Sequence, residues 1–389
     1  MVDLDDPLVG SRRVKVVLWA AVALSAVLVV VGLVALWPAD RSTGLDPLGL
    51  DAEPLKADVV TSQLTPCSYD PVLVCRIIGF ELREGPDAGQ IRAIELDAGS
   101  PLRTGDGIFV LGFVDVEGVT QYSFYEFQRS TPMLLLFLVF ATAVLILGRW
   151  RGLGALAGLA LSLLTIVWFT LPSLLSGNST IAVALITAGV IAFLTLFLAH
   201  GLTVSSAVAL LSTFMSLALI VILGWLFVAA TKLTGLSDDS SLVLGALGTT
   251  IDARGIVLAG LVIGALGVLD DVTVTQVSAV WELRRARPDL TTVELYRPAL
   301  RIGRDHISST VNTLFLAYAG AALPLLLLFN EAAQSFSSVV TRELIAVEVV
   351  RALVGSIGLV ASVPISTYLA AWVVTSVQRT GTDQPTVAA

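Results

Sequence analysis

GIVLAGLVIGALGVLDDVTVTQVSAVW, residues Gly255 to Trp281, is an apolar stretch that is long enough to cross a lipid bilayer and contains two adjacent aspartates. About 20 consecutive apolar residues are needed for one helical crossing. A carboxylate within the bilayer costs about 2.5–3.5 kcal/mol even on the most lenient scale. Asp270 and Asp271 therefore indicate a site that binds or moves a charged species. The alternative is that both acids lie among lipid headgroups at the end of the helix.

The composition of the chain is that of a polytopic membrane protein. Of its 389 residues, 56% are apolar and only 14% are charged, and the mean hydropathy is +0.87, which excludes an ordinary soluble domain. A net charge of −8 provides no basic surface for nucleic acid. The two histidines are far apart, which leaves no Cys/His zinc motif. No GxxxxGK[ST] loop, HExxH helix or GxSxG turn is present, so we expect no enzyme activity and no cofactor. The sequence leaves open whether the chain binds a cation and which cation that would be.

About eight apolar segments predict an α-helical membrane protein with a long polar interlude. The first, residues 14–37, begins among three basic residues, Arg12, Arg13 and Lys15, and is too long for a signal-peptide core, so we expect a transmembrane anchor. The others form a transmembrane domain, residues 132–378, with segments at 132–148, 153–175, 179–199, 203–230, 255–281, 307–329 and 345–377.

The distribution of basic residues predicts the orientation of these segments. Arginines gather in two loops, near residues 149–151 and 284–304, and such loops face the cytoplasm. The N-terminus (1–13) and the tail (379–389) are then cytoplasmic as well, and the polar interlude lies outside the cell.

The polar interlude, residues 39–130, predicts a small extracytoplasmic β domain. Its strand-like runs are bounded by turn residues and cover Asp58–Leu64, Val72–Glu81, Gln90–Leu96, Gly107–Val114 and Gln121–Phe127. An OB-like barrel is the expected fold. An oxidising exterior favours a disulfide between Cys67 and Cys75, although two free thiols are the alternative.

The segment before the aspartate-containing span does not fit a simple helix count. If residues 241–255 continued into the next span, the helix would measure about 60 Å, twice the thickness of the hydrocarbon core. The chain must therefore break near Asp252, and a re-entrant segment is one solution. Residues 242–252 also align without gaps on residues 261–271, which places Asp252 on Asp271. This is either an internal repeat or a chance similarity of two Gly/Leu-rich segments.

Helical spacing gives the aspartate-containing span one face of small and polar residues. This stripe consists of Gly260, Gly264, Gly267, Asp271, Thr275, Ser278 and Glu282. Because small residues let another helix approach closely, we predict that the stripe points into the helix bundle. Asp271 then lies inside the bundle, and Asp270 lies about 100° around the helix. Ordinary helix packing is the alternative to a functional role.

The next span presents further polar residues on one face. Asp305, Ser309 and Asn312 share it, and Asn312 needs a partner within a membrane, for which either aspartate is a candidate. The expected binding residues are Asp270, Asp271, Thr275, Asp305, Ser309, Thr310 and Asn312. Secondary candidates are Asp252, Arg254, Arg304, Glu348 and Arg351, the last two also explicable as a structural ion pair.

Several of these motifs occur together in a known family. GALGVLDDV (264–272), GRDHISSTVNTLFLAY (303–318) and EVVRALVGSIGLVASVPIST (348–367) give the chain a clear resemblance to the YibE/F family of bacterial integral membrane proteins. The resemblance covers most of residues 55–378. The family pattern has a single acid where Asp271 stands, so Asp270 is a departure. The resemblance implies architecture more than activity.

We therefore expect a secondary transporter or exporter in the cytoplasmic (inner) membrane. It would move a small ion or solute across the lipid bilayer, with Asp271 as the binding or coupling carboxylate. The alternative is a non-transporting assembly or sensor protein whose outer β domain binds a partner. Whether the chain forms a homo-oligomer stays open.

Overall fold

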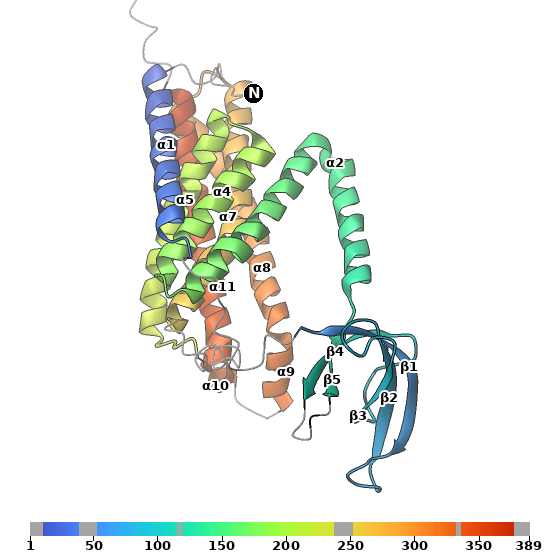
Figure 1. Cartoon of the computed structure of the whole chain (residues 1–389). Helices are drawn as coiled ribbons and strands as arrows, with labels where there is room; N and C mark the ends of the chain where they lie inside the picture. Colours follow the sequence, from blue (N-terminus) through green and yellow to red (C-terminus); the bar gives the residue numbers. More distant parts are fainter. Residues whose placement is uncertain are drawn as a thin grey trace, which may run out of the picture. The chain divides into compact units, whose positions relative to one another are not determined.

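The computed structural model of the chain consists of two compact units, shown in Figure 1. The helical unit comprises residues 1–42 and 144–389, and the β unit comprises residues 43–143. The structure describes residues 11–38, 53–114, 118, 120–236, 252–331 and 336–376.

The β unit is a five-stranded antiparallel sheet that nearly closes into a barrel. Its strands are β1 (Leu55–Pro66), β2 (Val74–Leu82), β3 (Ile91–Asp97), β4 (Gly107–Val114) and β5 (Thr120–Phe127). Their order in the sheet is β3-β2-β1-β4-β5, and the two outer strands, β3 and β5, approach each other. The five expected strands are therefore confirmed, whereas the more specific OB-like assignment stays a prediction.

Alternating side chains of these strands form the core of the β unit. Phe80, Ile78 and Ile108 are fully buried there, as period-two strand geometry requires of the residues on one face. A disulfide joins Cys67 to Cys75 across the turn between β1 and β2.

The helical unit contains the long helices of the chain. Their bounds are α1 (Arg12–Ala35), α2 (Ser130–Thr165), the π-turn η2 (Ile166–Thr170), α3 (Leu171–Leu175), α4 (Thr180–His200), α5 (Val204–Ala230), α7 (Ala253–Ala286), α8 (Thr292–Ala321), α9 (Leu323–Glu331), α10 (Phe336–Val340) and α11 (Glu343–Thr375). Helix α2 begins in the β unit and bends sharply at Arg149, whose φ is 51°. This bend separates the two apolar segments expected at 132–148 and 153–175.

Among the described residues, six helical stretches are long and apolar enough to cross a membrane. They are α1, the continuous stretch Ser130–Leu175, α4, α5, α7 and α11. The segment expected at 307–329 falls in α8 and α9, which are not among the six. The expected figure of about eight crossings thus stays a prediction. Helix α7 begins at Ala253, at the break expected near Asp252, and residues 241–251 lie outside the described part of the chain.

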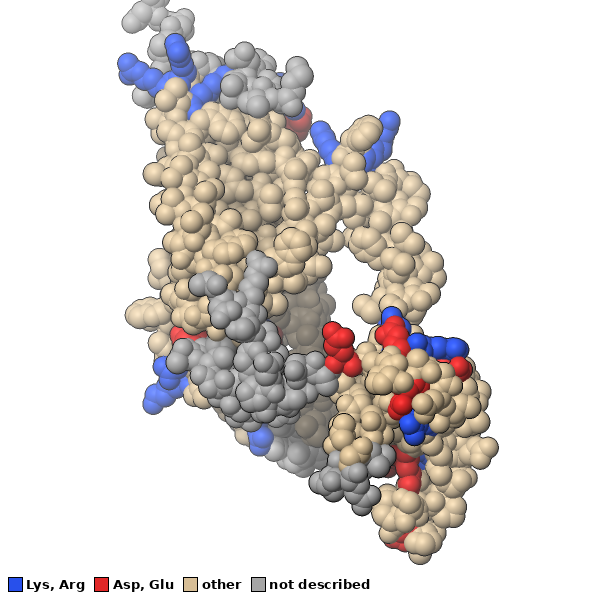
Figure 2. Space-filling model, viewed as in Figure 1, with Lys and Arg blue, Asp and Glu red and all other residues tan. Residues whose placement is uncertain are grey.

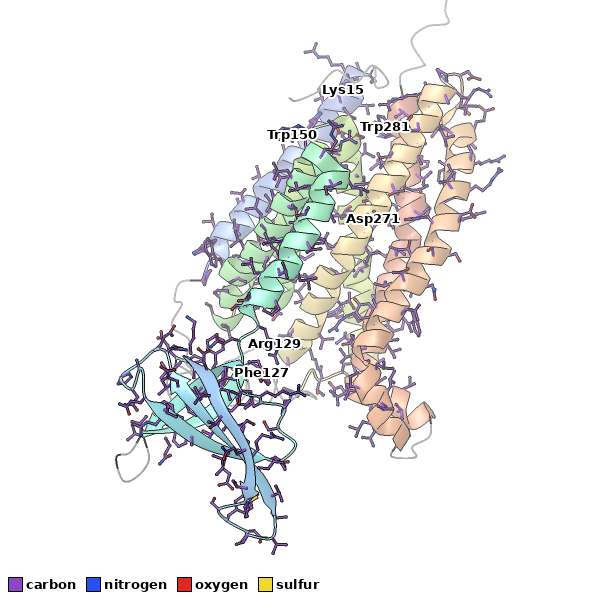
Figure 3. The ribbon with its side chains drawn as sticks, turned by 90° about the vertical axis from the view of Figure 1, so that its right-hand side faces the viewer. Lys15, Phe127, Arg129, Trp150, Asp271 and Trp281 are labelled. Atoms are coloured by element: carbon purple, nitrogen blue, oxygen red, sulfur yellow. A yellow bond between two sulfur atoms is a disulfide. The ribbon has the colours of Figure 1, made fainter. Side chains whose placement is uncertain are left out.

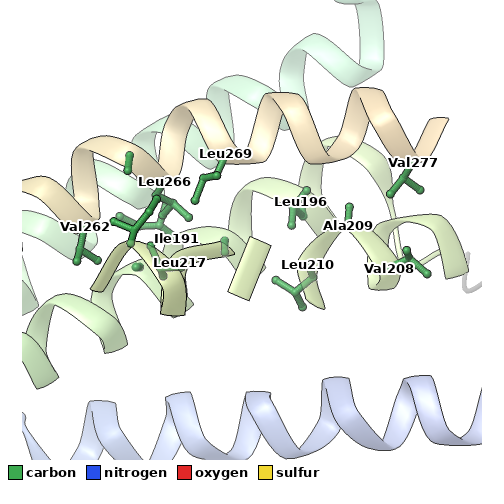
Figure 4. Close-up of a cluster of buried hydrophobic side chains, with 14 of the residues drawn as sticks. Ile191, Leu196, Val208, Ala209, Leu210, Leu217, Val262, Leu266, Leu269 and Val277 are labelled. Atoms are coloured by element: carbon green, nitrogen blue, oxygen red, sulfur yellow. The ribbon is translucent and has the colours of Figure 1, made fainter. Parts of the chain in front are cut away.

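Helices α5, α7 and α11 pack together at the centre of the helical unit, with α4 against α5 and α7 and with α8 against α7 and α11. Figure 4 shows part of this core, where Leu266 of α7 lies near Ile191 of α4 and Leu217 of α5. The outer surface of the same unit carries a broad band without charged side chains on the face drawn in Figure 2.

Candidate functional site

The exposed and buried faces of α7 are opposite to those expected. Asp271 is exposed, and so are the other members of the stripe, Gly260, Gly264, Gly267, Thr275, Ser278 and Glu282. Figure 3 labels Asp271 about midway along α7, on its outward face. The prediction that Asp271 points into the bundle is therefore wrong. The physical reason is that large side chains of α7, such as Leu266 and Leu269, fill the space against α4 and α5.

Asp270 is the acid that faces the bundle. Its Oδ2 accepts a hydrogen bond of 2.8 Å from the hydroxyl of Thr195 on α4. Its Oδ1 is buried and has no hydrogen-bond partner among the described residues. A buried polar atom of this kind is rare in folded proteins, because desolvation without a hydrogen bond is unfavourable.

Two further hydroxyl groups lie beside this carboxylate. Thr213 of α5 and Thr273 of α7 are fully buried, and their hydroxyls are 2.9 Å apart. The Thr273 hydroxyl also donates to the backbone carbonyl of Asp270 at 3.2 Å. The three helices α4, α5 and α7 thus bring together a carboxylate and three threonine hydroxyls. This oxygen-only set suits a proton or a hard cation rather than a soft metal.

A second polar contact fixes the other side of α7. The Gln276 amide nitrogen donates to the backbone carbonyl of Ala299 on α8 at 2.7 Å and to the Thr367 hydroxyl on α11 at 3.0 Å. Gly303 of α8 lies against the same amide and against Val363, so closely that a Cβ atom would not fit. These contacts hold the registers of α7, α8 and α11, and they are structural rather than part of the carboxylate site.

The expected residues of α8 do not join the aspartates. Asp305, Ser309 and Asn312 are exposed, and the Thr310 hydroxyl bonds to the backbone carbonyl of His306 within its own helix. Among the described hydrogen bonds, none connects Asn312 to either aspartate. The expected site is thus divided. Asp270 faces α4 and α5, Asp271, Thr275, Asp305, Ser309 and Asn312 are exposed on α7 and α8, and the Thr310 hydroxyl bonds within α8.

The secondary candidates do not gather in one place. Arg254 and Arg304 are exposed, and Asp252 lines a polar cavity of about 160 Å³ together with Asn178 and Thr180. Glu348 and Arg351 form an ion pair on α11 with an N–O distance of 2.6 Å, and both side chains are largely buried. Neither group contacts Asp270 in the described structure.

The sequence interpretation missed Thr195 and Thr213. Both lie in apolar helices that contain several other hydroxyl residues, and threonine in such a helix commonly bonds to its own backbone. Their positions gave no local indication of a shared site. Only the packing of α4 and α5 against α7 brings them to Asp270.

The long apolar helices of the described residues are consistent with a multi-pass membrane protein. The chain belongs to the YibE/F family, because the family model described as YibE/F-like protein matches residues 136–376. This match confirms the resemblance drawn from the sequence motifs. It includes Asp270 and its threonine neighbours and leaves out the five strands. Neither the curated proteins nor the solved structures gave a match to the chain.

Proposed function

We propose that the chain is a secondary transporter that moves a small ion or solute across the cytoplasmic membrane, with Asp270 as its binding or coupling carboxylate. The observation that carries the proposal is the buried, unpartnered Oδ1 of Asp270 within a set of threonine hydroxyls. An acid in such a place is costly and is typically retained for ion or proton movement.

A route for the ion to this carboxylate is suggested by the exposed face of α7. Most helices in the unit expose large apolar side chains, such as Leu24 of α1, Ile222 of α5 and Leu353 of α11, as lipid contact favours. Helix α7 instead exposes glycine, serine, threonine and the Asp271 carboxylate. Contact with lipid is unfavourable for such a polar face. We therefore propose that this face of α7 contacts water or another protein surface. Asp271 would then supply charge at the entrance, one residue from Asp270.

The distribution of basic residues supports an orientation of the helical unit in the membrane. Figure 3 shows Lys15, Trp150 and Trp281 toward the same end of the helical unit. The arginine-rich loops adjoin Trp150 and Trp281 in the sequence, so this end is the one that the positive-inside rule assigns to the cytoplasm. Both chain termini and the α7–α8 loop would then be cytoplasmic.

The test is ion flux into proteoliposomes that contain the full-length protein. Proton movement is followed with a trapped pH-sensitive dye, first under a pH gradient and then under sodium or potassium gradients. The proposal expects flux in the wild type, its loss in Asp270→Asn, and its retention in Asp305→Asn, a matched change on an exposed face. Flux that is absent for all three ions in the wild type, or that is equal in wild type and Asp270→Asn, would refute this role.

A non-transporting sensor or assembly protein is the second candidate, and the β unit favours it. The turn region around its disulfide exposes Tyr69, Val72 and Leu73, with Val72 88% exposed. Grouped apolar side chains on a surface commonly mark a protein contact. If Tyr69→Ser and Val72→Ser abolished the cellular phenotype of the protein while ion flux was absent from the wild type, this second function would replace the first.

A further inference from the structure

A polar cavity of about 160 Å³ lies where helices α4 and α7 begin. It is lined by the loop from α3 to α4, by the first residues of α4, and by Asp252, the residue before α7. Helix α7 runs from there past Trp281, which Figure 3 places with Lys15 toward one end of the helical unit. The cavity therefore lies toward the opposite end, which the proposed orientation assigns to the outside of the cell.

Three side chains at this cavity have oxygen atoms without a hydrogen-bond partner among the described residues. Thr180 is only 6% exposed, yet its hydroxyl makes no hydrogen bond there. Asp252, the N-cap residue of α7, makes no side-chain capping bond. The amide nitrogen of Asn178 donates to the backbone carbonyl of Leu36 at 3.2 Å and to the Ser173 hydroxyl at 3.0 Å. Both hydrogens of that amide are thus engaged, and its oxygen is left for another donor.

The side chains of Thr180 and Asp252 converge on one part of the cavity wall. A Cβ atom on Gly255 would lie 2.7 Å from the Thr180 hydroxyl oxygen and 2.9 Å from Oδ2 of Asp252. The two oxygens are therefore close enough for one small ligand to contact both. Because a buried hydroxyl without a partner is unfavourable, this arrangement indicates that the cavity takes a polar ligand.

The cavity presents charge of both signs. Asp252 supplies a carboxylate, which repels a simple anion. Helix α4 begins at Thr180, and its N-cap residue, Ser179, makes no side-chain capping bond. The first N–H groups of a helix have no partner within the helix and carry partial positive charge, which favours an anionic group and disfavours a bare metal cation. A ligand with one charged group of each sign matches both features.

We propose that this cavity binds a small zwitterion of the α-amino acid class. Its ammonium group donates to the Asp252 carboxylate and to the amide oxygen of Asn178. Its carboxylate accepts from the N–H groups at the start of α4 and from the Thr180 hydroxyl. A cavity of about 150 Å³ is large enough to hold benzene, and alanine has as many non-hydrogen atoms as benzene. Alanine therefore fits, with its methyl group toward the apolar side chains of Leu174 and Ile181, which also line the cavity.

The probe is L-alanine, and methylammonium and acetate each carry one of its two charged groups. Binding is measured by titration calorimetry on the full-length protein in detergent. Alanine is expected to bind at least about tenfold more tightly than either simple ion, because only alanine makes both sets of charged hydrogen bonds. No alanine binding, or binding of methylammonium or acetate as tight as that of alanine, would overturn the assignment.

The variant Asp252→Asn separates a ligand site from a purely structural helix end. Asparagine caps a helix as well as aspartate does, so α7 should still form, and thermal unfolding checks this. Alanine affinity should fall at least about tenfold, because the ammonium group loses its charged partner. Acetate affinity should stay the same or rise, because a repelling carboxylate is removed. An unchanged alanine affinity, or an equal loss for alanine and acetate, would contradict the assignment.

The variant Thr180→Val tests the part of the site that binds the carboxylate group. It removes the unpartnered hydroxyl, so alanine and acetate should both bind about three- to tenfold more weakly, whereas methylammonium affinity should not change. Asp305→Asn, a change at an exposed acid of α8, is the matched control and should leave alanine affinity unchanged. A loss in Asp305→Asn as large as that in Asp252→Asn would show a general effect of charge and would overturn the site.

This binding site is independent of the carboxylate at Asp270. Asp270 lies about 27 Å further along α7 than Asp252, so Asp270→Asn should change alanine affinity by no more than about twofold. Alanine binding without any ion flux would refute the proposed transport and leave this site standing. Ion flux in a wild-type protein that does not bind alanine would overturn this site and leave the proposed transport standing.

Discussion

Replacing Asp270 by asparagine is expected to stop ion movement without destabilising the fold. The asparagine side chain of this variant would keep one oxygen, which can still accept the 2.8 Å hydrogen bond that the Thr195 hydroxyl donates. The unpartnered Oδ1 of the wild type would be replaced by an amide, and a buried charge would be removed. Burying a charge without full pairing costs several kcal/mol. We therefore expect the free energy of unfolding to stay the same or to rise by about 1–3 kcal/mol.

Thr195→Val is the matched change on the other side of this hydrogen bond. It leaves Asp270 charged and removes the donor to its Oδ2, so it should destabilise the protein by about 1–3 kcal/mol. Thermal unfolding of detergent-purified protein at one fixed scan rate compares the two variants with the wild type. A loss of stability in Asp270→Asn as large as that in Thr195→Val would mean that Asp270 is a structural acid. That result would exclude Asp270 as the binding or coupling carboxylate.

Three further outcomes follow from the packing and the charges. Gly303→Ala should destabilise α8 by about 1–3 kcal/mol because a Cβ atom meets Val363, whereas Gly320→Ala, with open space around it, should be neutral or slightly stabilising in the same unfolding assay. Tyr122 donates to Asp87 at 2.8 Å and lowers the pKa of that carboxyl below its ordinary 3.8, so the β unit should lose stability as the pH falls below about 4. Hydrogen exchange of the wild type and of Tyr122→Phe, compared at the same pH values, measures this loss of stability. The loss on acidification should be smaller in Tyr122→Phe than in the wild type, and an equal loss would count against a role for this hydrogen bond. Replacing the two disulfide-bonded cysteines, eight residues apart, by serine should destabilise the β unit by about 2.5 kcal/mol and leave ion flux intact, which denaturation and vesicle assays can each check.

The β unit could be predicted from the sequence in outline because local chemistry defines its turns. Gly85 and Gly105 have φ values of 89° and 94°, a region that favours glycine, and both lie between consecutive strands. The break before α7 could also be predicted, because a continuous helix over residues 241–281 would be too long for one crossing of the bilayer. Closure of the sheet into a barrel depends on contacts between β3 and β5, which no local pattern contains.

The candidate site illustrates where sequence reasoning stops. Helical periodicity correctly placed Asp271 on one stripe with the glycines and Asp270 on a different face. It could not decide which face packs against the neighbouring helices, since that depends on how Leu266 and Leu269 meet α4 and α5. Small residues permit close helix packing but do not require it. Thr195, which bonds to Asp270, and Thr213 come from other helices, so they became visible only in the folded chain.

The proposed function requires that the Asp270 carboxylate exchanges a bound proton or cation. Infrared difference spectroscopy of the full-length protein in lipid tests this directly, by recording the carboxylate bands before and after exchange of protons or cations in the medium. We expect a difference band in the wild type and in Asp271→Asn that is missing from Asp270→Asn. Identical difference spectra for the wild type and Asp270→Asn would contradict it.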